Sequence, residues 1–215
     1  MKRTLSDHDR KQLDALISDV EKRTNTQIVL AVIQRSDIYA ELPWKAFALG
    51  ASITGLLVFV LDLIFSDWYS MVTGLIAVSG ILAGGAVFAS LTLLIPGFAK
   101  RFLSASRAEV EVRQYAESLF LSRELFATSN RTGILMLVSL FERKVVILPD
   151  KGLSDTLPAD GLQSIIAAMT IFLKKREIRR AFEAGLEQFS QILGTKVQGT
   201  GKNELSDEII EEKGV

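Results

Sequence analysis

Carboxylates that follow predicted strands are the residues of this chain best suited to chemistry. Asp150, Asp155 and Asp160 are evenly spaced after the third predicted strand, and Asp37 and Glu41 follow the first. Loops after strands are where α/β folds place their sites, and carboxylates there can act as nucleophiles or hold a metal ion that activates water. Asp150 is therefore the candidate catalytic residue, and Asp150 and Asp155 are the candidate metal ligands.

A structural interpretation of the same residues is favoured. Asp150 lies in a Pro-Asp-Lys-Gly sequence, which is typical of a tight turn, and Asp160 before a glycine suits the start of a helix. Glu142 and Arg143 could bind an anion, but a charged pair between two strands is more typical of a solvated turn. No cofactor is expected, apart from a divalent metal ion if the carboxylates are catalytic.

Composition excludes several classes of function. The 215 residues include 25 Lys and Arg, 25 Asp and Glu, one His and no Cys. A neutral chain without a basic stripe lacks the footprint of a nucleic-acid binder. Without cysteine there is no disulfide, thiol nucleophile or Cys-based zinc site, and a single histidine excludes multi-His metal sites and argues against a Ser-His-Asp triad.

The elements around these carboxylates are interrupted by an apolar segment. Only three charged residues lie between Trp44 and Phe98. Two membrane spans are predicted, over about 44–65 and 71–95, since each stretch offers the roughly 20 apolar residues that cross a bilayer. A buried hairpin in a soluble core is the alternative, but the remaining chain is too short to cover two such helices. A lipid bilayer is therefore the first expected partner.

Charges near the spans predict their orientation. The connection at Ser66-Asp67 is short, so both flanking segments must lie on one side of the membrane. The outer ends are flanked by Arg35, Lys45, Lys100, Arg101 and Arg107, whereas the turn has no Lys or Arg. The positive-inside rule predicts a multi-pass protein of the cell (inner) membrane with both termini in the cytoplasm.

Small residues recur at four-residue spacing in both spans. The pairs are Gly80 and Gly84 in the second span and Ala51 and Gly55 in the first. Such spacing lets two helix backbones approach closely. We expect it to pack the hairpin first, and to offer a homo-oligomer contact through Gly80 and Gly84 second.

The remaining sequence predicts one α/β domain divided by the spans. Helical periodicity and apolar runs predict a helix at 7–23 capped by Ser6 or Asp7, a strand at 28–33, a helix marked by Val112 to Phe120, strands at 134–138 and 145–148, and helices at 162–172 and 178–193. The expected organisation is 1–41 for the first part, 42–99 for the hairpin, 100–194 for the second part and 195–215 for a mobile acidic tail. Neither part has enough core alone.

The segment from Phe120 to Gly152 resembles the central motif of the TPM domain family, also called the TPM phosphatase domain. The similarity rests on Phe120, Thr128, Arg131-Thr132-Gly133-Ile134-Leu135, Val138-Ser139-Leu140, Glu142-Arg143, Val145-Val146-Ile147 and Asp150-Lys151-Gly152, and it extends into Ile165 to Met169 and Phe182 to Leu186. The resemblance implies a small α/β sandwich, here interrupted by a transmembrane helical hairpin. It also implies phosphatase activity as one candidate function, because that activity is attributed to plant thylakoid relatives.

Two functions are therefore expected from the sequence. The favoured one is an integral membrane protein whose TPM-like domain binds membrane proteins, as a binding or quality-control module. The alternative is a metal-assisted phosphatase, acting on phosphate esters or phosphoproteins through Asp150 and neighbouring carboxylates.

Overall fold

Residues 5–65, 70–153, 156–194 and 209–214 are described by the computed structural model, and they fall into two units. The first, called here the α/β unit, comprises Met1–Asp37 and Glu109–Val215. The second, called the hairpin unit, comprises Ile38–Ala108.

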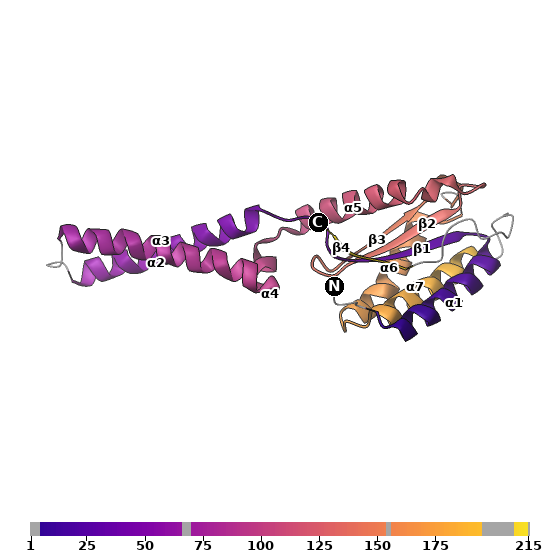
Figure 1. Cartoon of the computed structure of the whole chain (residues 1–215), viewed down its shortest axis with the longest axis horizontal. Helices are drawn as coiled ribbons and strands as arrows, with labels where there is room; N and C mark the ends of the chain where they lie inside the picture. Colours follow the sequence, from indigo (N-terminus) through magenta and orange to yellow (C-terminus); the bar gives the residue numbers. More distant parts are fainter. Residues whose placement is uncertain (1–4, 66–69, 154–155, 195–208, 215) are drawn as a thin grey trace. The chain divides into compact units, whose positions relative to one another are not determined.

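A four-stranded sheet forms the middle layer of the α/β unit (Figure 1), with the strand order β3-β2-β1-β4. The strands are β1 (Gln27–Arg35), β2 (Gly133–Ser139), β3 (Lys144–Pro149) and β4 (Ile210–Gly214). β1 runs parallel to β2 on one side and to β4 on the other, whereas β2 and β3 form an antiparallel hairpin. The three predicted strands are confirmed, and β1 lies between two strands that follow the apolar segment in sequence.

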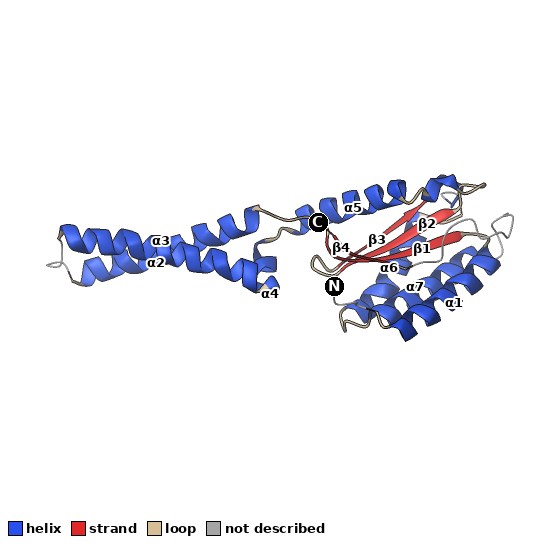
Figure 2. Ribbon diagram, in the orientation of Figure 1, coloured by secondary structure: helices blue, strands red, loops and turns tan. Residues whose placement is uncertain are grey.

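Helices cover both faces of this sheet (Figure 2). One face carries α1 (Asp7–Thr24), α6 (Ala159–Leu173) and α7 (Ile178–Leu193), and the other carries α5 (Ala105–Ser122). Side chains of β1 alternate between the two cores: Ile28, Leu30 and Val32 pack with the three-helix layer, and Val29, Ala31 and Ile33 pack with α5. Burial of both faces explains the unbroken apolar run of β1. The predicted α/β sandwich is confirmed.

The end of the chain differs from its prediction. The sequence indicated a mobile acidic tail from residue 195, but Ile210–Gly214 form β4. Ile209 and Ile210 are both buried, one in each core, and they anchor the strand. The prediction was wrong for this segment because Glu-Glu-Lys-Gly has little intrinsic preference for strands, so only its partners in the folded chain favour one. Residues 195–208 of the predicted tail lie outside the described part of the chain.

Two long apolar helices make up most of the hairpin unit. α2 (Glu41–Ile64) and α3 (Met71–Leu94) each have 24 residues, with mean hydropathies of 2.2 and 2.0 in their most apolar windows. A helix of that length spans about 36 Å, enough for the hydrocarbon core of a bilayer. Only 6% of each window is buried, so these are unlike core helices of a soluble protein. The predicted turn at Ser66-Asp67 lies outside the described residues.

Short helical segments complete the chain. In the hairpin unit, α3 is followed by α4 (Pro96–Ala99), which begins at Pro96 as a proline-started helix should, and by the 3-10 helix Lys100–Phe102. In the α/β unit, the 3-10 helices Leu125–Ala127 and Lys151–Leu153 precede β2 and follow β3.

Glycines bring α2 and α3 together. A Cβ atom added at Gly50 would lie 2.7 Å from the carbonyl oxygen of Gly84, and one added at Gly84 would collide with Thr54. The predicted packing role is therefore confirmed for Gly84. It is wrong for Gly80, where an added Cβ would meet nothing within 4 Å. The 3.6-residue helical repeat explains the difference, because a contact line between helices drifts away from a strict four-residue spacing.

Candidate functional site

Asp150, the candidate catalytic residue, is buried immediately after β3. Its Oδ2 atom accepts a hydrogen bond from Arg131 Nε at 2.7 Å, and its Oδ1 atom accepts one from Arg131 Nη2 at 2.8 Å. Oδ1 also accepts from the backbone N–H of Lys151 at 2.7 Å. The Asp150 side chain is 5% exposed and that of Arg131 is 53% exposed, so a fork-to-fork ion pair holds a buried carboxylate from the solvent side.

Glycines on either side of this ion pair let two backbone segments approach closely. A Cβ atom at Gly152 would lie 2.6 Å from the carbonyl oxygen of Arg131, and one at Gly133 would collide with the carbonyl oxygen of Leu125. The N–H of Gly152 donates to Arg131 O at 2.9 Å, and the N–H of Asp150 donates to Gly133 O at 2.8 Å. Residues 131–133 and 150–152 thus form one joint between the start of β2 and the end of β3, called here the Arg131–Asp150 joint.

The other predicted carboxylates do not gather around Asp150 among the residues described. Asp155 lies outside those residues, and Asp160 lies in the first turn of α6, as its helix-start interpretation predicted. Glu41 lies in the hairpin unit, with its carboxylate 3.9 Å from Arg107 Nε. Within the described ranges, no three Asp, Glu or His side chains are grouped to hold one metal ion. Metal binding by Asp150 and Asp155 stays a prediction.

Glu142 corrects one interpretation of the sequence. The solvated turn expected there is wrong for this residue, which is 4% exposed. Its carboxylate accepts hydrogen bonds from the Ser36 N–H at 3.0 Å, from Ser36 Oγ at 2.8 Å and from Ser139 Oγ. The end of β1 leaves a buried N–H that needs an acceptor, and Glu142 supplies it across 106 positions. Arg143 does occupy an exposed turn position, with φ of 55°.

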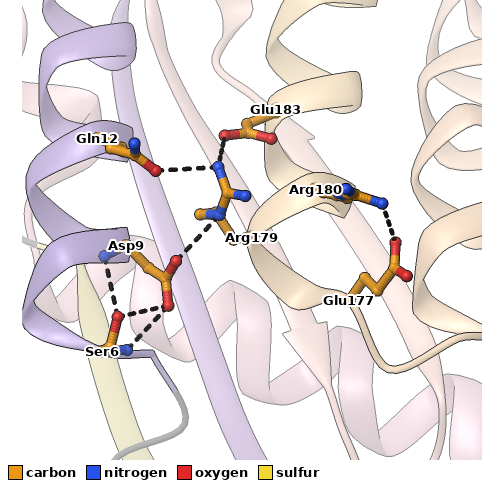
Figure 3. Close-up of polar contacts among 7 residues, drawn as sticks. All are labelled: Ser6, Asp9, Gln12, Glu177, Arg179, Arg180 and Glu183. Atoms are coloured by element: carbon orange, nitrogen blue, oxygen red, sulfur yellow. Dashed lines mark hydrogen bonds and ion pairs between the residues drawn. The ribbon is translucent and has the colours of Figure 1, made fainter.

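A polar cluster joins α1 to α7 (Figure 3). Arg179 donates to Asp9 Oδ1 at 3.0 Å, to Gln12 Oε1 at 3.0 Å and to Glu183 Oε1 at 2.6 Å. Ser6 caps α1 by accepting from the Asp9 N–H, while the Asp9 carboxylate accepts from the Ser6 N–H. The cap predicted at Ser6 is confirmed. The hydrogen bond from Ser6, followed by the charge of Arg179, lowers the pKa of the Asp9 carboxyl below its ordinary value.

Two neighbouring glutamates of β4 are held from opposite faces of the sheet. On the α1 face, Arg10 Nη2 lies 2.7 Å from Glu211 Oε1, and the N–H of Leu5 donates to the same atom at 3.3 Å. Arg10 Nη1 also donates to the carbonyl oxygen of Ile209 at 3.3 Å. The Glu211 side chain is only 5% exposed, so this contact is largely desolvated.

On the α5 face, Tyr115 and Arg123 hold Glu212. The Tyr115 hydroxyl donates to Glu212 Oε2 at 2.6 Å, and Arg123 Nη2 donates to Oε1 at 3.1 Å. Burial, and then the bond to Glu212, raise the pKa of the Tyr115 phenol, so it remains a neutral donor. A cavity of about 410 Å³ adjoins this contact, lined by Tyr115, Ser118, Leu119, Ser122, Arg123 and Glu212.

Sequence reasoning missed this arrangement, although one signal for it was present. Residues 209–212 are two isoleucines followed by two glutamates. In an extended strand successive side chains point to opposite faces, so each face receives one apolar and one acidic side chain. Arg10, Tyr115 and Arg123 are donors at the three contacts, so the arrangement is suited to recognising carboxylates on an extended segment rather than to moving protons.

Comparisons with known proteins agree with the fold. Residues 102–192 match the family model described as the TPM domain. The NMR structure of the BA42 protein from the psychrophilic bacterium Bizionia argentinensis is similar, with a TM-score of 0.58 over 98% of this chain and 97% of that one, at 14% identity. At that identity the likeness concerns the fold alone. No curated protein matches the sequence. The matched residues include both halves of the Arg131–Asp150 joint, and residues 102–192 of the chain are therefore a TPM domain.

Proposed function

We propose that this protein is a membrane-anchored binding or quality-control module for membrane proteins. The two apolar helices would insert as a hairpin in the cell (inner) membrane and leave both termini in the cytoplasm. The α/β unit would then act on neighbouring proteins at the membrane surface.

The observation that carries this proposal is that the buried carboxylates of Asp150 and Glu142 accept hydrogen bonds from other groups of the protein. Both oxygens of Asp150 accept from Arg131, and Glu142 accepts from Ser36 and Ser139. A nucleophile or metal ligand needs an oxygen lone pair directed at the reacting group or ion. The hydrogen bonds of these two side chains instead close the ends of strands, which supports a binding role over catalysis.

A phosphatase assay separates this function from the alternative. The full chain, purified in detergent, is incubated with p-nitrophenyl phosphate and with Mg²⁺, Mn²⁺, Ca²⁺ or Zn²⁺ in turn. We expect no metal-dependent turnover. Turnover that Asp150→Asn abolishes and the matched control Asp160→Asn retains, with both variants folded by circular dichroism, would replace the binding function with phosphatase chemistry.

Photo-crosslinking in intact membranes tests the binding function directly. A photoreactive amino acid is placed at exposed positions of the α/β unit such as Leu121 and Ile171. We expect at least one position to give discrete products with membrane proteins. Only diffuse background from every position would contradict a binding module.

Cysteine labelling tests the proposed orientation. The chain has no cysteine, so single cysteines at Ser66 and Ser6 report only on those two positions. We expect an impermeant thiol reagent to label Ser66→Cys alone in intact cells, and both variants after permeabilisation. Labelling of Ser6→Cys from outside would reverse the orientation.

A further inference from the structure

β4 has the features of a bound ligand more than those of a structural strand. It is a five-residue edge strand, it pairs with β1 alone, and residues 195–208 connect it to the rest of the chain. That connecting sequence is polar and includes Gly199 and Gly201. By contrast, β2 and β3 are joined by a short turn.

Four consecutive residues, Ile209 to Glu212, contact different features of the α/β unit. Ile209 and Ile210 enter the two cores, Glu211 meets Arg10, and Glu212 meets Tyr115 and Arg123. This alternation is how sheet edges recognise extended peptides, because main-chain bonds give affinity and alternate side chains give specificity.

Gly214 adds a further requirement to the recognised sequence. It pairs with Arg35 in the register of β1, with a φ of 77°. A Cβ atom there would collide with the carbonyl oxygen of Arg35. Lys213, between Glu212 and Gly214, is exposed. The pattern that the edge accepts is therefore two apolar residues, two carboxylates, one unrestricted residue and a glycine.

The groups that contact the strand lie on elements that also pack on parts of the α/β unit other than β4. Arg10 lies on α1, which packs on α7, and Tyr115 and Arg123 lie on or directly after α5, which packs on β1 and β2 through Val112 and Ala116. The edge of β1 that β4 covers, and the side chains that donate to its carboxylates, would thus persist as a site if β4 left it.

We propose that the edge of β1 now covered by β4, with Arg10, Tyr115 and Arg123, is a peptide-binding site for an extended acidic segment of a partner protein. The chain's own β4 is the resident occupant and is displaced when a partner segment of the same pattern binds. This inference rests on the proposed binding function and assigns it a site. The cavity beside Glu212 gives a longer partner side chain room to extend.

Cleavage of the connecting segment tests the site in the folded full-length protein. A protease site is introduced within residues 195–208, the purified chain is cut in detergent, and a fluorescent peptide of residues 209–215 is added. We expect the labelled peptide to exchange into the sheet with one-to-one stoichiometry, measured by fluorescence anisotropy. The uncut chain should bind it at least tenfold more weakly, since the tethered strand competes at high effective concentration.

Peptide variants test what the site recognises. Replacing both glutamates, Glu211→Gln with Glu212→Gln, should weaken binding at least tenfold, and Gly214→Ala should also prevent binding. The matched control is Lys213→Gln, which should bind like the parent peptide. On the protein, Arg123→Ala should weaken binding, whereas Arg113→Ala, an exposed arginine of α5 paired with Glu117, should not.

Two results would overturn the proposal. If the cut chain keeps its own strand and admits no labelled peptide, β4 is a permanent part of the fold. If the glutamine peptide binds as tightly as the parent, the edge does not select carboxylates. If the peptide exchanges and phosphatase turnover depends on Asp150, the site is supported and the proposed binding function is rejected. If neither exchange nor turnover is observed, the site alone is rejected.

Discussion

The α/β unit contains two acidic attachments that differ in construction. At the Arg131–Asp150 joint, backbone atoms are so close that Gly133 and Gly152 leave no room for a side chain. At β4, the side chains of Arg10, Tyr115 and Arg123 hold Glu211 and Glu212. The first attachment lies within the residues that match the family model, whereas Arg10 and the two glutamates of the second lie outside them. A strongly patterned motif can therefore mark the rigid part of a fold, while a less patterned segment offers an exchangeable contact.

The largest expected effect comes from filling the joint. Gly152→Ala places a methyl group against backbone oxygens that cannot move aside, so we expect the free energy of unfolding to fall by about 2–4 kcal/mol. Chemical denaturation of the detergent-solubilised chain, followed by circular dichroism, measures it. Gly161→Ala in α6 is the matched control, since its new methyl group meets side chains at ordinary distances of 3.5 Å. Equal losses from both variants would show that the joint is not tightly constrained.

Removing the charge of the joint should have the next largest effect on stability. Asp150→Asn keeps the shape but loses the charge-assisted pair with Arg131, and we expect a loss of about 1–3 kcal/mol. The same denaturation experiment measures it against Asp160→Asn. A variant as stable as the parent would mean that the buried carboxylate is retained for another purpose, and would favour the catalytic interpretation.

The β4 attachment should show a smaller, shared loss. In a double-mutant cycle, Tyr115→Phe removes the donor and Glu212→Ala the acceptor of the same hydrogen bond, so we expect a coupling of about 0.5–1.5 kcal/mol. Amide hydrogen exchange of β4 measures the free energy of local opening of this strand, which global unfolding does not resolve. Lys213→Gln is the control. If the free-energy loss of the double variant equals the sum of the losses of the two single variants, the two groups do not depend on each other.

The smallest effect concerns the cluster between α1 and α7. The pKa of Asp9 is lowered in the folded state, so its contribution is present above the ordinary value of 3.8 and is lost as the pH falls through the folded pKa. We expect Asp9→Asn to remove a few tenths of a kcal/mol at pH 7 and to flatten this acid dependence, because the side chain is partly exposed. Ser6→Ala should raise the pKa of Asp9 toward its ordinary value. An unchanged pH profile in both variants would contradict the assignment.

Most regular elements were predictable from the sequence because their signals are local. The apolar stripe of α7 begins at Ile178 and ends at Leu193, as in the structure, and the apolar run of β1 identified a strand buried on both faces. The two long helices were evident from hydropathy alone. These patterns depend on residues within one or two turns, or on alternate positions of one strand.

The features that the sequence did not predict depend on distant partners. Glu142 is buried where its carboxylate accepts from Ser36, and β4 is a strand because it pairs with the edge of β1 that β2 leaves open. Neither neighbour is visible from local composition. The position of Asp150 after a strand was predictable, but its pairing with Arg131 depends on the β2–β3 hairpin, which brings the two residues together.

The central position of β1 has a consequence for the order of events during synthesis. β1 leaves the ribosome with both edges free, and β2 begins 98 positions after β1 ends, at Gly133 against Arg35. At ordinary elongation rates that interval is roughly 5 to 20 s. During this interval the newly made Ile-Val-Leu-Ala-Val-Ile segment has no partner strand, and an exposed apolar strand of this kind promotes aggregation. We therefore expect nascent chains stalled before Gly133 to recruit chaperones through this segment, and chains extended beyond Pro149 to release them.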